Sequence, residues 1–320
     1  MSQDFERLAK TKYAHHPLVA EERTRDESVT VEEAITRAMP SMIRDVLENE
    51  ALYPDFPCIN PHDPQYKFYL EKMLVGRERV VVLQCYLKHE KGETMPAICK
   101  YYRSEERSID YELECYSKLR KLGCPVPWFS SNFTFMGQRV LIMQSLLPCR
   151  HKLDCKGGKC AGCTDWVRLA LDVLDQLKYL HQFGVHCDLK PDNIMMVPEN
   201  PYGKHPKLPY RYVIIDYGGT AVKKTSGGYY RFTRNPKFTS QPKDAKDRHY
   251  CTPWHDLIEL GYVCNYFDLR SRYGPKNSKN LKTDFEHPTL KRYMEYVKSL
   301  DLNKLPDNVI KMCKKILKEK

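Results

Sequence analysis

The pattern of apolar and polar positions changes character near the middle of the chain. Between Tyr66 and Gln144 the apolar residues form short runs rich in β-branched and aromatic side chains, which is typical of strands. From Thr164 onward the apolar residues recur every three or four positions, which indicates amphipathic helices. A strand-rich half followed by a helical half predicts an α+β fold of two lobes with a cleft between them.

The same pattern places the individual elements. The expected strands span residues 67–74, 80–87, 95–102, 128–135, 138–144, 194–197 and 212–215. The expected helices span residues 105–122 and 255–267, and two more begin at the capping residues Thr164 and Asp307.

Composition shifts along the chain predict the domain boundaries. Residues 1–65 are expected to be a helical extension and linker, because a capping box at Thr30–Glu33 precedes apolar positions and prolines then accumulate. The main domain spans 66–320 and divides into a strand-rich lobe at 66–144, a hinge insertion at 145–163 and a helical lobe at 164–320.

The overall composition is that of an ordinary globular chain. Its 320 residues are 42% hydrophobic and 29% charged, which is compatible with a folded core. The apolar runs are far shorter than the about 20 residues of a membrane helix, so no membrane span is expected. The 13 cysteines are odd in number and lie partly inside apolar patterns, which favours a reducing, intracellular location, in the cytoplasm or nucleus.

The formal net charge of +11 indicates an acidic partner. Eight lysines and arginines lie between residues 216 and 253, which favours acidic or phosphorylated protein segments as partners. A plain solvated basic surface is the alternative. The chain carries no zinc-finger, RNA-recognition or helix-turn-helix signature, so no motif supports nucleic acid as a partner.

The strongest chemical signal is the segment His186–Asn193, followed by Asp216-Tyr217-Gly218. Asp188 and Asn193 lie five positions apart, and two expected strands separate them from Asp216. Phosphoryl transfer needs positioning, Mg²⁺ and a residue that orients the attacking hydroxyl. Because Mg²⁺ prefers oxygen ligands and keeps several waters, one Asn and one Asp together with phosphate oxygens suffice to hold it.

This constellation resembles the protein kinase superfamily from about residue 66 to the end of the chain. The resemblance implies a bilobal fold with an antiparallel β-rich N-lobe and a helical C-lobe. By position, Asp188 resembles the catalytic-loop aspartate, whereas Asn193 and Asp216 resemble the Mg²⁺ ligands, the latter in a D-Y-G variant of D-F-G. Lys190 is then expected to contact the transferring phosphate, which completes a catalytic set of Asp188, Lys190 and Asn193.

The resemblance also implies an ATP site in the strand-rich lobe. Ala97-Ile98-Cys99-Lys100 resembles the strand that carries the ATP-binding lysine, and Glu112 is its expected ion-pair partner. Glu112 is preferred because Tyr116 repeats its helix face, and the rivals are Glu105, Glu106 and Glu114. The other expected ATP contacts are Leu74, Gly76, Leu83, Met143, Gln144 and Leu146, with the adenine beside Met143–Leu146.

A finer resemblance lies downstream. Residues 256–262, Asp-Leu-Ile-Glu-Leu-Gly-Tyr, are similar to the D-L-E-x-L-G-Y segment of the casein kinase 1 and vaccinia-related kinase group. Phe238-Thr239-Ser240-Gln241 stands where that group has a Ser-containing substrate-loop motif. The resemblance implies a protein Ser/Thr kinase and suggests a large DNA virus as a source, in which case the virion is a further location.

Three departures from the kinase pattern stand out. Only Gly76 remains of a G-x-G-x-x-G loop, and Glu78 would bring negative charge near ATP. Cys187 replaces the arginine of the catalytic H-R-D, which argues against gating by a phosphorylated activation loop. Two alternatives therefore stay open: a pseudokinase that acts as a binding or scaffold module, and a small-molecule kinase.

The hinge insertion holds a possible zinc site. Cys149, Cys155, Cys160 and Cys163 end in a C-x-x-C pair, the commonest half of a tetrahedral zinc site. The residues between them lack a core-forming pattern, so Zn²⁺ would supply order that apolar burial does not. An exposed cysteine-rich loop is the alternative.

Overall fold

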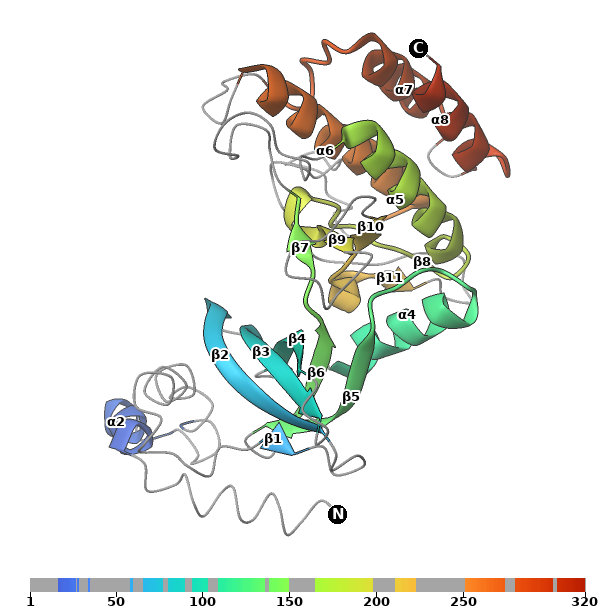
Figure 1. The fold of residues 1–320 in the computed structure, drawn as a ribbon. Helices are drawn as coiled ribbons and strands as arrows, with labels where there is room; N and C mark the ends of the chain where they lie inside the picture. Colours follow the sequence, from blue (N-terminus) through green and yellow to red (C-terminus); the bar gives the residue numbers. More distant parts are fainter. Residues whose placement is uncertain are drawn as a thin grey trace. The chain divides into compact units, whose positions relative to one another are not determined.

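The computed structural model describes the chain in fourteen stretches. These are residues 17–26, 28, 34, 58–59, 66–76, 80–89, 94–102, 109–135, 138–149, 165–197, 211–222, 251–273, 280–301 and 304–319. They form a mixed α+β fold with antiparallel sheets, which confirms the predicted class (Figure 1). None of the helices described is long and apolar enough to cross a membrane.

The chain divides into two compact units. Unit 1 comprises residues 1–113 and 128–145, and unit 2 comprises 114–127 and 146–320. Helix α2, Pro17–Arg25, lies in the first. Helix α4, Ile109–Lys121, contributes its first turn to unit 1 and the rest to unit 2.

Unit 1 is built on a six-stranded antiparallel sheet in the order β1-β2-β3-β4-β6-β5. The strands are β1 Cys58–Ile59, β2 Tyr66–Gly76, β3 Val80–His89, β4 Thr94–Tyr102, β5 Phe129–Phe135 and β6 Gln138–Gln144. Alternate residues of β3, from Val81 to Leu87, are buried, as the period of a strand requires. The register places Lys100 of β4 opposite Val82 of β3 and Leu141 of β6.

Besides most of α4, the described residues of unit 2 form four α-helices and short strand pairs. The helices are α5 Trp166–Leu180, α6 Pro253–Tyr273, α7 Pro288–Lys298 and α8 Val309–Lys318. Helix α5 packs against α6 and α8, and α7 packs against the same two helices (Figure 1). The strands are β7 Leu147–Pro148, β8 Gly184–Val185, β9 Ile194–Val197, β10 Arg211–Ile214 and β11 Ala221–Val222. Gln176 of α5 fastens this helix to β10, because its side chain bonds the Tyr212 carbonyl and the Ile214 amide.

Several boundaries differ from the sequence-based expectation. Asp165 rather than Thr164 caps α5, since its carboxylate accepts hydrogen bonds from two amides of the first turn. Helix α8 begins after Asn308 rather than at Asp307. Helix α7 was not predicted, although its buried residues Leu290–Val297 follow helical spacing. The helices expected between residues 30 and 50 fall almost wholly outside the described residues.

We expect Gly261→Ala to weaken the packing of α6 on α7. A Cβ atom at this position would overlap the Met294 sulfur and crowd the Tyr293 ring at 3.2 Å. Overpacking of this kind costs about 1–3 kcal/mol, so the variant should unfold at a lower temperature. Met294→Ala makes room, so the costs of the two changes should be less than additive in the double variant. Additive costs would contradict this packing.

Candidate active site

The segment 186–193 forms a loop between β8 and β9 that brings three predicted catalytic side chains together. The Asn193 amide nitrogen Nδ2 donates to the Asp188 carbonyl at 2.9 Å and to Asp188 Oδ2 at 3.1 Å. Lys190 Nζ lies 2.5 Å from the same Oδ2. Asp188 is thus held from both sides by polar groups of its own loop, and its side chain is 13% exposed.

The strand pair β9–β10 brings the Asp216 segment to this loop. Ile214 pairs with Ile194, and the next amide, that of Ile215, donates to the Asn193 carbonyl at 2.9 Å. Asp216 follows with a left-handed backbone, φ 65°, a conformation that Asp tolerates better than most residues. The two expected Mg²⁺ ligands, Asn193 and Asp216, therefore lie on segments joined directly by a backbone hydrogen bond.

Tyr217, the middle residue of D-Y-G, is fully buried in unit 2. Its ring makes edge contacts with Tyr116, at 4.9 Å between centroids, and with His186, at 5.4 Å. The His186 Nε2 atom lies 3.0 Å from the Ile215 carbonyl. These contacts fix the turn after β10 against the start of the 186–193 loop.

Two buried carboxylates of α6 hold the same loop from beneath. Asp256 accepts the His186 amide at Oδ2 and the Cys187 amide at Oδ1, each at 2.9 Å. Glu259, one turn later, accepts the Leu189 amide at 3.0 Å. The sequence singles out residues 256–262 only as a family likeness. Two carboxylates set among the apolar residues of the segment Leu257–Leu260 were the available signal for this positioning role.

His181 completes the support of the loop. It caps the C-terminal end of α5, and its Nε2 lies 2.9 Å from Asp256 Oδ2. Burial alone would raise the pKa of Asp256, but the hydrogen bond and charge of His181, the nearby His186 and the Cys187 amide outweigh it, so this pKa lies below its ordinary value. Asp256 therefore stays an ionised acceptor near neutral pH. The sequence gives no sign of this contact, because the two residues lie 75 positions apart.

Cys187, at the position of the H-R-D arginine, lies in an apolar environment. Its backbone is left-handed, φ 64°, and its side chain is buried with Val185, Ala221 and Cys251. Burial, and next the hydrogen bond with Cys251, raise the pKa of the Cys187 thiol well above its ordinary value. The position thus carries a neutral thiol where an arginine would need a charged or polar partner.

In unit 1, Lys100 and Glu112 form a buried ion pair. Lys100 Nζ donates to the two carboxylate oxygens of Glu112 at 3.0 and 3.1 Å, and the Glu112 side chain is fully buried. The rival Glu114 pairs with Lys118 on the surface of α4 instead. The other rivals, Glu105 and Glu106, lie outside the described residues.

The expected ATP contacts in unit 1 divide between the two faces of the sheet. Directly paired residues of neighbouring strands share a face, so Val82 and Leu141 lie on the face of Lys100. Met143 pairs with Ile98, two residues before Lys100, and so lies on this face as well. Leu83 pairs with Cys99 and points to the opposite face, where it is fully buried. We therefore expect Val82, not Leu83, to share a surface with Lys100.

The other expected ATP contacts lie at strand ends. Leu74 is 45% exposed on β2, and Gly76 ends that strand opposite Val81. Gln144 ends β6 with its side chain 3.4 Å from the Trp128 amide. Leu146 belongs to unit 2 and directly precedes β7.

Most of the predicted zinc and substrate-binding residues lie outside the described part of the chain. Of the four hinge cysteines only Cys149 is described, and its thiol donates to the Ile194 carbonyl at 3.1 Å. Cys155, Cys160 and Cys163 fall outside, as do the basic residues between 223 and 248. Within the residues that are described, no group of three or more His, Cys, Asp or Glu side chains is arranged to hold a metal.

We expect Asp256→Asn to destabilise unit 2 and to change its response to acid. The pKa of Asp256 is lower in the folded protein than the ordinary value of about 3.9. Its stabilisation is therefore complete above that value and is lost as pH falls through the folded-state pKa. An asparagine would turn an NH₂ group toward one loop amide, which costs about 1.5–3 kcal/mol at neutral pH.

Urea unfolding between neutral pH and pH 3 measures this effect. The unfolding free energy of Asp256→Asn should be lower than that of the wild type at neutral pH and should fall less steeply in acid. The exposed Glu295 provides the matched control, since Glu295→Gln removes a carboxylate of α7 without touching the loop. Equal stability of the two variants would contradict the role given to Asp256.

The chain matches no family model, and no curated protein matches it. The kinase resemblance therefore remains a prediction from the motifs, to be judged on the geometry of the 186–193 loop and its neighbours.

Proposed function

We propose that this protein is a Mg²⁺- and ATP-dependent protein Ser/Thr kinase, with acidic or phosphorylated segments as its favoured substrates. The observation that carries the proposal is that the side chains of Lys190 and Asn193 both contact Asp188. Asp216 directly follows Ile215, whose amide donates a hydrogen bond to the Asn193 carbonyl. Phosphoryl transfer depends on such positioning more than on covalent chemistry.

Asp188 would orient the attacking hydroxyl. Both side-chain donors, from Lys190 and Asn193, contact its Oδ2, so its Oδ1 would accept the hydrogen bond of the Ser or Thr hydroxyl of the substrate. The carboxylate would accept that proton as the oxygen–phosphorus bond forms. Lys190 would lie beside the transferring group and balance its negative charge.

The oxygen atoms near Asp188 fit Mg²⁺. Both hydrogen bonds of the Asn193 side chain use its Nδ2 atom, which leaves the amide oxygen outside these bonds. Together with the Asp216 carboxylate it would form the hard oxygen pair that Mg²⁺ accepts alongside phosphate oxygens and water. Asn193 and Asp216 would hold the ion, and Mg²⁺ when bound neutralises charge on the ATP phosphates.

Lys100 would orient the α- and β-phosphates of ATP, and Glu112 would fix Lys100. A buried lysine is retained as a charge only when it is paired, and Glu112 offers both of its oxygens to the Lys100 ammonium. Glu112 thus holds the Lys100 ammonium in a fixed position in unit 1, which is the property that a phosphate-binding lysine requires.

The test is the transfer of labelled γ-phosphate from ATP to acidic and basic protein mixtures with Mg²⁺. We expect Asp188→Asn to lower turnover by at least about a hundredfold, since positioned acid–base groups contribute roughly 10²–10⁴. ATP binding should persist in this variant, because Asp188 is assigned to the hydroxyl. Glu295→Gln, which removes an exposed carboxylate far along the chain, should leave turnover unchanged.

Two results would overturn the proposal. Equally slow transfer by the wild type and Asp188→Asn would favour a pseudokinase that acts as a binding module. Asp188-dependent transfer to small hydroxyl compounds, with none to protein, would favour a small-molecule kinase.

A further inference from the structure

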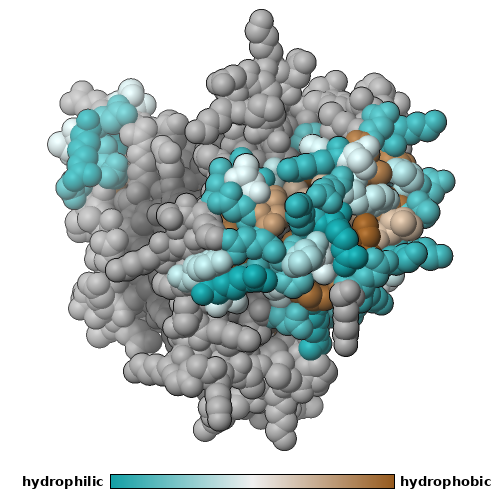
Figure 2. Space-filling model, turned by 90° about the horizontal axis from the view of Figure 1, so that it is seen from above, coloured by the Kyte–Doolittle hydropathy of each residue, from teal (hydrophilic) through white to brown (hydrophobic). Residues whose placement is uncertain are grey.

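A groove of about 1020 Å³ lies in unit 2, away from the 186–193 loop. Its walls are the last turns of α5 and the outer face of α8, and the segment 305–307 and Pro253 close it. Figure 2 shows that described residues on the face nearest the viewer are mostly hydrophilic, with smaller apolar areas among them. The groove belongs to no part of the kinase proposal, so we asked what it is suited to bind.

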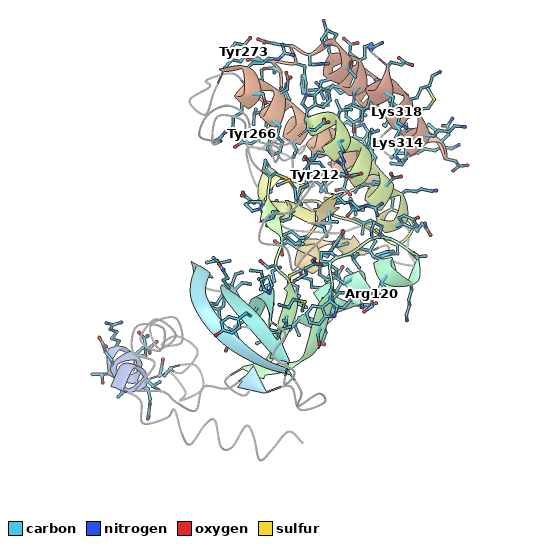
Figure 3. The ribbon with its side chains drawn as sticks, viewed as in Figure 1. Arg120, Tyr212, Tyr266, Tyr273, Lys314 and Lys318 are labelled. Atoms are coloured by element: carbon cyan, nitrogen blue, oxygen red, sulfur yellow. The ribbon has the colours of Figure 1, made fainter. Side chains whose placement is uncertain are left out.

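Lysines outnumber acidic residues in the lining of the groove. Its lining includes the five lysines Lys178, Lys311, Lys314, Lys315 and Lys318, against the three acids Asp175, Asp307 and Glu319. Two of the acids already have cationic partners, Lys314 for Asp175 and Arg292 for Glu319. Lys314 and Lys318 lie on successive turns of α8 (Figure 3).

Four of the lysines have no acidic partner among the described residues. Within the part of the chain that the structure describes, Lys178, Lys311, Lys315 and Lys318 make no ion pair, and all four are exposed. They come from two helices that face the same groove. Unpaired like charges gathered on both walls favour an anionic occupant.

The apolar part of the lining narrows the class of occupant. Leu305, Pro306, Val309 and Ile310 line the groove beside the lysines. Among the described lining residues there is no Phe, Tyr, Trp or Arg, the residues that usually stack on nucleic-acid bases. A concave groove also fits a single chain better than a flat lipid surface. A lining of both charged and apolar residues matches an extended peptide with acidic and aliphatic side chains.

One wall of the groove is connected to the 186–193 loop. His181 lines the groove, and its Nε2 lies 2.9 Å from Asp256 Oδ2. Asp256 in turn accepts the amides of His186 and Cys187. Any occupant that restrains His181 therefore acts on the carboxylate that holds the loop, through two consecutive hydrogen bonds.

We propose that this groove binds an acidic, extended segment of a partner protein, and that occupancy stabilises the 186–193 loop through His181 and Asp256. The docking does not depend on phosphoryl transfer. A negative kinase assay would not contradict the docking proposal, and a negative peptide-binding assay would not contradict the kinase proposal.

Binding is tested on the full chain by fluorescence anisotropy, with a labelled peptide of alternating glutamate and leucine as the probe. Reversal of two wall charges in Lys311→Glu/Lys315→Glu should weaken binding about tenfold, since exposed charge pairs contribute a few tenths to one kcal/mol each. The control Lys121→Glu/Lys291→Glu changes net charge equally at exposed sites outside the groove and should stay within about twofold of wild type. A peptide with serine in place of leucine should bind more weakly.

Three outcomes would overturn the docking site. They are no binding of the peptide, equal loss of binding in the groove and control variants, and groove-dependent binding of a single-stranded oligonucleotide or an anionic vesicle in preference to the peptide.

Hydrogen exchange tests whether occupancy of the groove stabilises the 186–193 loop through His181 and Asp256. The amides of His186 and Cys187 should exchange several-fold more slowly when the peptide is bound, and this slowing should disappear in His181→Ala. Peptide binding without any change in the exchange rates of these amides would contradict the proposed stabilisation of the loop.

Discussion

The arrangement of unit 2 depends on the hydrogen bonds that the buried Asp256 carboxylate makes. A fully buried charge must be compensated by hydrogen bonds, and this one receives two loop amides and the ring of His181. These contacts join the 186–193 loop and the end of α5 to α6. The cost of burying the charge is thus offset only when the loop that carries Asp188 is in place, so the fold and the site form together.

Helix α6 has the pattern that such a role requires. Residues on all its sides are buried, from His255 to Leu269, so it lies inside the unit rather than on its surface. Gly261 lets α7 approach closely on one side, while Asp256 and Glu259 point at the loop from another. One helix therefore links the core, the loop and, through His181, the wall of the cationic groove.

The sequence predicted the elements better than the contacts between them. Strands β2 to β6 follow from short β-branched runs, and α5 follows from its spacing, because these signals are local. The roles of Asp256, Glu259 and His181 depend on residues about 70 positions away, which no local pattern reports. Leu83 was expected to contact ATP, and only the pairing of β3 with β4 shows that Val82 rather than Leu83 shares the face of Lys100.

The Asp188 group could be predicted because its members lie close in sequence. Asp188, Lys190 and Asn193 lie within six residues, and their order resembles the catalytic loop of protein kinases. Asp216 joins them through a strand pair whose register was not predictable. The replacement of arginine by Cys187 was visible in the sequence, but its apolar neighbours Val185, Ala221 and Cys251 were not.

The central claim, that the loop at Asp188 is a site for metal-bound ATP, is tested most directly by a crystal structure. Crystals grown with a non-hydrolysable ATP analogue and Mn²⁺ would locate the metal by its anomalous signal. The account predicts a peak within coordination distance, about 2.0–2.3 Å, of the Asn193 amide oxygen and an Asp216 carboxylate oxygen. A nucleotide bound with its metal elsewhere, or no nucleotide at saturating concentration, would contradict it.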